Sequence, residues 1–263
     1  MTTRFINDLA VEIDGDAGDG QPAVLCIHGL GGSSNTWTPV LDALAGFKVI
    51  RPDLPGSARS PLGADKLSID VYVTALEGLL ASLDIGAVHV VAHSLGTVIA
   101  QHFAVRNPGK VKSLALFGPL VAPPEAARPN ITARAQLARS GPAAMQEIAD
   151  AIVKGATGQE TKQNPAVLAL VRECVMRQSP EGYAQSCEAL AAAQSAEIER
   201  ITVPTLLVTG DQDGVAPAAN VAVMAERIQG SRQVVFEACG HWTTFEKPKA
   251  CMQELQAFHG SLR

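Results

Sequence analysis

The chain has 263 residues, of which 47% are hydrophobic and 18% charged, enough apolar material for one large domain with a substantial core. Aromatic residues make up only 4%, so stacking on nucleic-acid bases is not expected. The formal net charge is −5 and the sequence contains no basic run. Nucleic acid and anionic membranes are therefore poor candidate partners.

The first residues lack the long apolar core of a signal peptide, and the five cysteines show no C-x-x-C spacing. The most apolar stretch, Ala87 to Val105, is interrupted by several polar residues and is not expected to span a membrane. We therefore predict a cytoplasmic protein without a disulfide framework, a metal site or a cofactor. The sequence leaves open whether the chain forms a homodimer.

Short apolar runs alternate with segments of helical periodicity, a pattern that predicts a mainly parallel, doubly wound α/β sheet. A turn rich in Gly and Asp is expected over Asp14 to Gly20. The predicted strands are residues 4–6, 9–13, 22–27, 48–51, 88–91, 111–117, 205–208 and 232–236. The predicted helices are residues 68–83, 95–106, 217–228 and 248–258.

One long block breaks this alternation. Residues 123–199 contain many helix formers and no convincing strand. We predict that this block is a helical cap, or lid, inserted over the carboxyl edge of the sheet. The chain then divides into a core domain of residues 1–122 and 200–263 and a cap domain of residues 123–199.

The most informative motif is the run Val90-Val91-Ala92-His93-Ser94-Leu95-Gly96. An apolar strand ends at a serine, a helix-compatible stretch follows, and small residues lie two positions on either side of Ser94. This is the layout of a nucleophile elbow, in which a tight strand–turn–helix exposes a serine hydroxyl at the edge of a parallel sheet. The usual first small residue is Gly, and Ala92 adds one methyl group.

A serine hydroxyl needs a base to become nucleophilic, and that base needs an acid to orient it. His241 and Asp213 each follow a predicted strand, in the runs Ala238-Cys239-Gly240-His241 and Gly210-Asp211-Gln212-Asp213. The order Ser94, Asp213, His241 is that of the α/β-hydrolase architecture. We predict that these three residues form a catalytic triad.

Asp211 is a rival for the acid. It lies nearer the end of the strand, where an aspartate often only ties down a turn. We therefore favour Asp213.

Two backbone N–H groups are expected to form an oxyanion hole. One belongs to Leu95, directly after the serine, and the other to Leu30 in the glycine-rich loop His28-Gly29-Leu30-Gly31-Gly32. Neighbouring residues are predicted to contribute to substrate binding, namely Gly29, Gly31, His93 and Trp242. His28 and His93 are also expected to orient backbone groups.

Together with Asp53-Leu54-Pro55-Gly56, these motifs resemble those of the α/β-hydrolase family over nearly the whole chain. The segment Ser179-Pro180-Glu181-Gly182-Tyr183-Ala184-Gln185 is similar to the cap of the 3-oxoadipate enol-lactonase and carboxylesterase group. That resemblance implies hydrolysis of a small carboxylic ester or lactone. After Gly56, Ser57-Ala58 replace the His-Gly that many relatives have.

We therefore predict a serine hydrolase that forms an acyl-enzyme on a small-molecule ester or lactone. The same triad can serve C–C bond hydrolysis, hydroxynitrile lyase or perhydrolase chemistry, and a non-catalytic ligand receptor is a further alternative. An aspartate nucleophile, as in haloalkane dehalogenases, is disfavoured by Ser94. The cap offers three candidate partners for a substrate anion, namely Arg128, Arg134 and Arg139.

Overall fold

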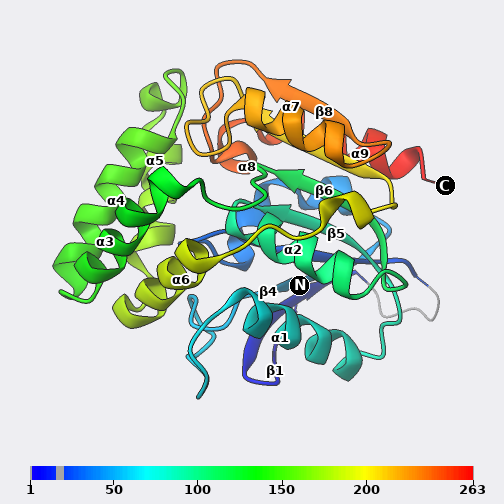
Figure 1. Cartoon of the computed structure of the whole chain (residues 1–263), viewed down its shortest axis with the longest axis horizontal. Helices are drawn as coiled ribbons and strands as arrows, with labels where there is room; N and C mark the ends of the chain where they lie inside the picture. Colours follow the sequence, from blue (N-terminus) through cyan, green and yellow to red (C-terminus); the bar gives the residue numbers. More distant parts are fainter. Residues whose placement is uncertain (1, 16–20, 263) are drawn as a thin grey trace.

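The computed structural model describes residues 2–15 and 21–262, so most of the turn expected over Asp14 to Gly20 lies outside the described residues. In this part of the chain, eight strands form one sheet in the order β1-β2-β4-β3-β5-β6-β7-β8. The pairs β1–β2 and β2–β4 are antiparallel, and the other neighbours are parallel (Figure 1). The predicted mainly parallel sheet is confirmed.

Each predicted strand is present with ends that shift by at most two residues. The strands are β1 (Thr2–Ile6), β2 (Leu9–Asp14), β3 (Ala23–Ile27), β4 (Lys48–Pro52), β5 (Val88–His93), β6 (Val111–Phe117), β7 (Thr205–Gly210) and β8 (Arg232–Phe236). The α-helices outside the long block are α1 (Ile69–Ser82), α2 (Leu95–Arg106), α7 (Ala218–Arg227), α8 (Thr243–Glu246) and α9 (Pro248–Gly260).

The central strands are buried on both faces, which explains their continuous apolar sequences. In β3, Leu25 and Ile27 belong to a core cluster shared with α1 and α2, whereas Val24 and Cys26 belong to a cluster on the other face. That second cluster includes residues of α9 and of a 3₁₀ segment, η1 (Ser34–Leu44). Side chains alternate between the two faces because the strand repeat is two residues.

The sequence analysis did not predict η1. Ser33 begins it by accepting a hydrogen bond from Asn35 N at 3.3 Å, and Pro39 lies inside it. Proline removes a backbone donor, so the segment lacks the clear α-helical signal that marked the other helices. Its fully buried Trp37 anchors the segment against the sheet.

The long block between β6 and β7 is helical, as predicted. Its α-helices are α3 (Arg128–Ala138), α4 (Pro142–Ala156), α5 (Pro165–Met176) and α6 (Pro180–Ala192), and the short 3₁₀ turn η3 (Thr161–Gln163) lies between α4 and α5. These helices form a group of their own to the left of the sheet in Figure 1, and we call them the cap helices. They share a core cluster with Trp242 and Phe245, which follow β8.

No helix among the described residues is long and apolar enough to cross a lipid bilayer. The five cysteines are buried free thiols, namely Cys26, Cys174, Cys187, Cys239 and Cys251.

Candidate active site

Ser94 lies between β5 and α2 in a strained backbone conformation, with φ of 52° and ψ of −120°. A non-glycine residue in such a conformation costs of order 1–3 kcal/mol, which the surrounding fold must offset. Gly96 lies so close to β3 that a Cβ there would be 2.4 Å from Ile27 O. The small residue two positions after Ser94 is therefore a steric requirement of the turn.

The structure brings together the three residues proposed as a triad. His241 Nε2 lies 2.8 Å from Ser94 Oγ, and His241 Nδ1 lies 2.8 Å from Asp213 Oδ2. A Cβ on Gly118, which follows β6, would lie 2.8 Å from His241 Cε1. Glycine at this position therefore leaves room for the imidazole ring.

Asp213 is held as an ionised carboxylate. Burial acts to raise the pKa of this carboxyl, but the charge and hydrogen bond of His241 outweigh burial and hold the pKa well below its ordinary value. The N–H groups of Val215 and Ala216 add to the effect by donating to Asp213 Oδ1, each at 2.8 Å.

Asp211, the rival acid, has a different place. Its side chain is exposed and accepts a hydrogen bond from Cys239 N at 3.1 Å. Asp211 therefore joins the turn after β7 to the loop that carries His241, and Asp213 is the carboxylate in contact with the imidazole.

The glycine-rich loop after β3 packs directly against the serine. A Cβ on Gly29 would lie 2.7 Å from Ser94 Cβ, and Gly31 adopts a φ of +73°. His28 fixes the start of this loop, because its Nδ1–H donates to Gly29 O at 2.8 Å while its Nε2 accepts from Leu54 N at 2.9 Å. Burial lowers the pKa of His28, in keeping with this neutral, hydrogen-bonded state.

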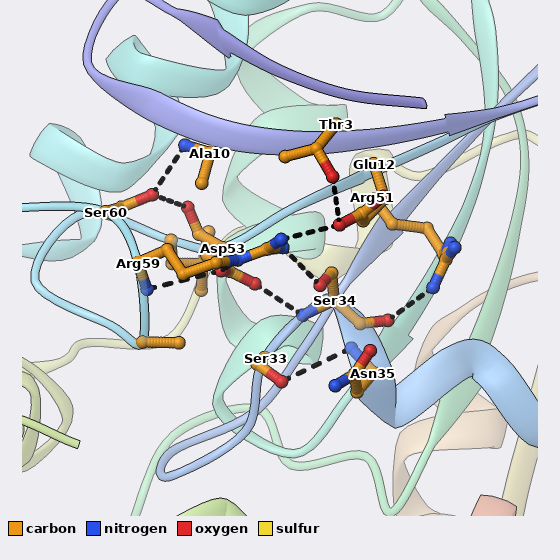
Figure 2. Close-up of polar contacts among 12 residues, drawn as sticks. Thr3, Ala10, Glu12, Ser33, Ser34, Asn35, Arg51, Asp53, Arg59 and Ser60 are labelled. Atoms are coloured by element: carbon orange, nitrogen blue, oxygen red, sulfur yellow. Dashed lines mark hydrogen bonds and ion pairs between the residues drawn. The ribbon is translucent and has the colours of Figure 1, made fainter. Parts of the chain in front are cut away.

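An ionic network around the buried carboxylate of Asp53, shown in Figure 2, fixes the far end of the same loop. Asp53 accepts hydrogen bonds from Ser34 N at 2.7 Å and from Arg59 Nε at 2.8 Å. Arg59 also donates to Ser34 Oγ at 3.0 Å and to Glu12 Oε1 at 2.6 Å. The loop is thus tied at both ends to the segment that follows β4.

Gln178, which follows α5, holds the glycine-rich loop from the cap side. Its Nε2 donates to Gly31 O at 3.2 Å and Gly32 O at 3.0 Å, and its Oε1 accepts from Ala58 N at 2.9 Å. This role of Gln178 was not predicted, because nothing local in the sequence distinguishes a glutamine that holds a loop from one that is solvated.

A cavity of about 410 Å³ opens at Ser94 and His241 and extends under the cap helices. Most of its wall is aliphatic or aromatic. Predicted residues in the wall, besides Ser94 and His241, are Leu30, Trp242 and the candidate anion partner Arg134. Gly29, Gly31 and His93 do not line this cavity, and their substrate contacts stay a prediction.

His93 instead contacts the backbone of the loop that carries His241. It is 2% exposed, and its Nε2–H donates to His241 O at 2.8 Å. Burial, followed by the charge of His241, lowers its pKa to about 3, so the ring is neutral. The expectation that His93 orients a backbone group agrees with this contact.

A family model described as alpha/beta hydrolase fold matches residues 22–248. This chain belongs to the alpha/beta hydrolase family. The predicted fold class is thereby confirmed.

Similar proteins within the family carry different activities in their names. The enol-lactonase from Burkholderia xenovorans LB400 has a TM-score of 0.89 at 27% identity, over 98% of this chain and 100% of that one. A 2-hydroxy-6-oxononadienedioate/2-hydroxy-6-oxononatrienedioate hydrolase from Pseudomonas putida is 28% identical over 93% of this chain and 92% of its own length. Lipase 3 of Moraxella sp. is 25% identical over 99% of this chain and 84% of its own length.

Another residue that the sequence analysis missed in this alpha/beta hydrolase is Glu246, in α8. Its Oε2 accepts hydrogen bonds from Gly158 N at 2.7 Å, Thr161 Oγ1 at 2.8 Å and Gly240 N at 3.0 Å. Its Oε1 accepts from Trp242 N at 2.9 Å. One carboxylate therefore joins the segment after α4 to Gly240 and Trp242, the two residues that flank His241 in the sequence.

We expect Glu246→Gln to lower the free energy of unfolding by about 2 kcal/mol, measured by urea denaturation. Both carboxylate oxygens face donors, so the amide nitrogen of glutamine must meet an N–H group and leave it without a partner, at about 1–3 kcal/mol. Glu254→Gln is the matched control, since Glu254 pairs with Arg232 on the surface at 2.6 Å. Equal stabilities of the two variants would contradict this role for Glu246.

Proposed function

We propose that this alpha/beta hydrolase is a serine hydrolase that cleaves a small carboxylic ester or lactone through an acyl-enzyme. The observation that carries the proposal is the continuous chain of hydrogen bonds from Ser94 through His241 to Asp213. Ser94 and His241 border a largely apolar cavity that is large enough for a small ester. The enol-lactonase and lipase among the similar proteins support this reaction class.

In the proposed mechanism, Ser94 Oγ attacks the ester carbonyl while His241 Nε2 takes its proton. Asp213 holds the proton on His241 Nδ1 and stabilises the imidazolium. The N–H groups of Leu95 and Leu30 stabilise the negative charge that develops on the carbonyl oxygen. His241 returns the proton to the leaving oxygen, then activates a water molecule that hydrolyses the acyl-enzyme and frees Ser94.

A fluorophosphonate probe, with the adduct mapped by mass spectrometry, tests the proposal. We expect stoichiometric labelling at Ser94 that is lost in His241→Ala, because the hydroxyl reacts only when a base takes its proton. Asp211→Asn is the control that should keep its label. Absence of labelling in folded protein, or labelling that survives His241→Ala, would refute an activated serine.

C–C bond hydrolysis is a second candidate, favoured by the similarity to the Pseudomonas putida hydrolase. That reaction also needs a serine, a histidine and an oxyanion site, so the triad alone does not distinguish the two. Product analysis with a vinylogous 1,5-diketone and with simple esters separates them. If the diketone is turned over faster than the simple esters, C–C bond hydrolysis replaces ester hydrolysis as the proposed reaction.

The division into a core domain of residues 1–122 and 200–263 and a cap domain of residues 123–199 is part of the proposal. We also propose a cytoplasmic location. The five buried free thiols support it, since a reducing compartment preserves them.

A further inference from the structure

One positive charge lies in the wall of an otherwise largely apolar cavity. Among the described residues of that wall, Arg134 is the only lysine or arginine, and there is no aspartate or glutamate. A guanidinium is always charged at neutral pH, and a charge facing an apolar space is costly unless an anion meets it. The cavity is therefore electrostatically suited to a substrate with a negative group.

The other two candidate arginines of the cap are occupied elsewhere. Arg139 pairs with Glu181 at 2.9 Å and with Glu188 at 2.6 Å on the surface. Arg128 donates to Ala193 O at 2.9 Å and pairs with Glu125 at 3.3 Å. Within the described residues no carboxylate pairs with Arg134, and its neighbours are the neutral Tyr183 hydroxyl and Cys187 thiol, so its charge is left for an anionic ligand.

The register of α3 directs Arg134 to the cavity. Residues 127, 130, 131 and 134 all contribute to the wall, and this spacing of three, one and three residues defines one face of a helix. Asn130 lies one turn before Arg134 on that face and brings an amide with two further donors.

A second donor lies in the wall beside Arg134. Tyr183 on α6 is 1% exposed, and its hydroxyl lies next to the Arg134 guanidinium and the Cys187 thiol without a well-formed hydrogen bond among the described residues. A Cβ on Gly31 would lie 3.3 Å from Tyr183 Cε2, so the ring borders the loop beside Ser94. Burial raises the pKa of this hydroxyl while the nearby charge of Arg134 opposes the rise, so it stays protonated and can donate.

We propose that Arg134 and Tyr183 form a subsite for a carboxylate that the substrate carries in addition to its scissile ester. This inference rests on the proposed function and names its substrate class, namely small esters or lactones with a free carboxylate. The guanidinium supplies charge-assisted hydrogen bonds, and the buried hydroxyl donates a further one. A neutral ester leaves the charge of Arg134 without an anion, so binding of the carboxylate produces selectivity.

The test compares matched acyl chains. One series contains the 4-nitrophenyl monoesters of succinate, glutarate and adipate, and the other contains neutral 4-nitrophenyl esters of the same chain lengths. We expect kcat/KM of the best anionic ester to exceed that of its neutral match by at least about 10-fold. Arg134→Met should lower this ratio by about 10- to 100-fold, chiefly through KM.

Further variants separate the subsite from a general effect on the cap. Arg134→Lys should give an intermediate ratio, because lysine keeps the charge but loses the planar fork. Tyr183→Phe should lower the ratio by about threefold to tenfold. Arg139→Met, which removes a paired surface arginine, should keep the same ratio of anionic to neutral kcat/KM as wild type. A neutral preference in wild type, or an unchanged ratio in Arg134→Met, would overturn the proposal.

Binding without turnover makes the two proposals separable. In Ser94→Ala, glutarate should raise the melting temperature, and Arg134→Met should abolish that rise. If neither ester series is hydrolysed but glutarate still stabilises Ser94→Ala through Arg134, the proposed reaction fails and the subsite stands. If neutral esters are hydrolysed and glutarate has no effect, the subsite fails and the proposed reaction stands.

Discussion

Asp213→Asn should lower kcat for ester hydrolysis by about 10⁴-fold while the protein remains folded. The carboxylate now accepts the proton of His241 Nδ1 at 2.8 Å. An asparagine amide donates there instead, which moves the imidazole proton to Nε2 and leaves no base facing Ser94. Steady-state kinetics with a chromogenic ester, together with circular dichroism, measures the effect.

Asp211→Asn is the matched control for this change. It removes the same charge two residues away, but the asparagine oxygen can still accept the hydrogen bond of Cys239 N. Activity should stay within a few-fold of wild type. A comparable loss in both variants, or less than a 10-fold loss in Asp213→Asn, would mean that Asp213 does not set the tautomer of the base.

Asp53→Asn should lower the free energy of unfolding by about 3 kcal/mol, measured by urea denaturation at neutral pH. The carboxylate is fully buried and receives hydrogen bonds from Arg59 Nε and Ser34 N (Figure 2). Asparagine can keep the bond from Ser34, but it loses the ionic partner of Arg59. Because Ser34 follows the glycine-rich loop, labelling of Ser94 by the fluorophosphonate should also slow.

Glu197→Gln controls for loss of an ion pair on the surface, since the Glu197 and Arg200 side chains are 72% and 61% exposed. Exposed pairs contribute about 0–1 kcal/mol, so this variant should unfold almost as wild type does. If Asp53→Asn lowers the free energy of unfolding no more than Glu197→Gln does, the network around Asp53 does not hold the loop.

Acid should narrow the difference in unfolding free energy between wild type and Asp53→Asn. Burial acts to raise the pKa of Asp53, but the hydrogen bonds of Arg59 and Ser34 outweigh it and hold the pKa below its ordinary value. The carboxylate therefore stabilises the fold fully above about pH 4 and loses this contribution as the pH falls through its lowered folded pKa. Urea curves at about pH 7 and about pH 3 should show the gap narrowing.

The positions of Ser94, Asp213 and His241 could be predicted because each follows a strand. Parallel strands end at one edge of a sheet, so residues far apart in sequence meet there without any knowledge of packing. The strands themselves were evident from apolar runs, since both faces of β3 and β5 are buried.

The supporting residues could not be predicted in this way. Gln178 reaches a loop 146 residues away, and Glu246 reaches Gly158 across 88 residues. Such contacts depend on how the cap helices pack against the core, which no local pattern encodes. The choice of Arg134 among three arginines likewise depends on the surface carboxylates that pair with Arg139 and Arg128.

The bridge made by Glu246 sets a rule for building chimaeras of this enzyme with other members of its family. His241 N donates to Ala156 O at 2.8 Å, so the backbone after α4 contacts the histidine loop as well as the carboxylate. A transplant of all residues between β6 and β7 would exchange that backbone too. A donor cap in which the segment equivalent to residues 156–161 differs in length would displace His241. Swaps that keep this segment native should therefore retain activity where complete swaps lose it.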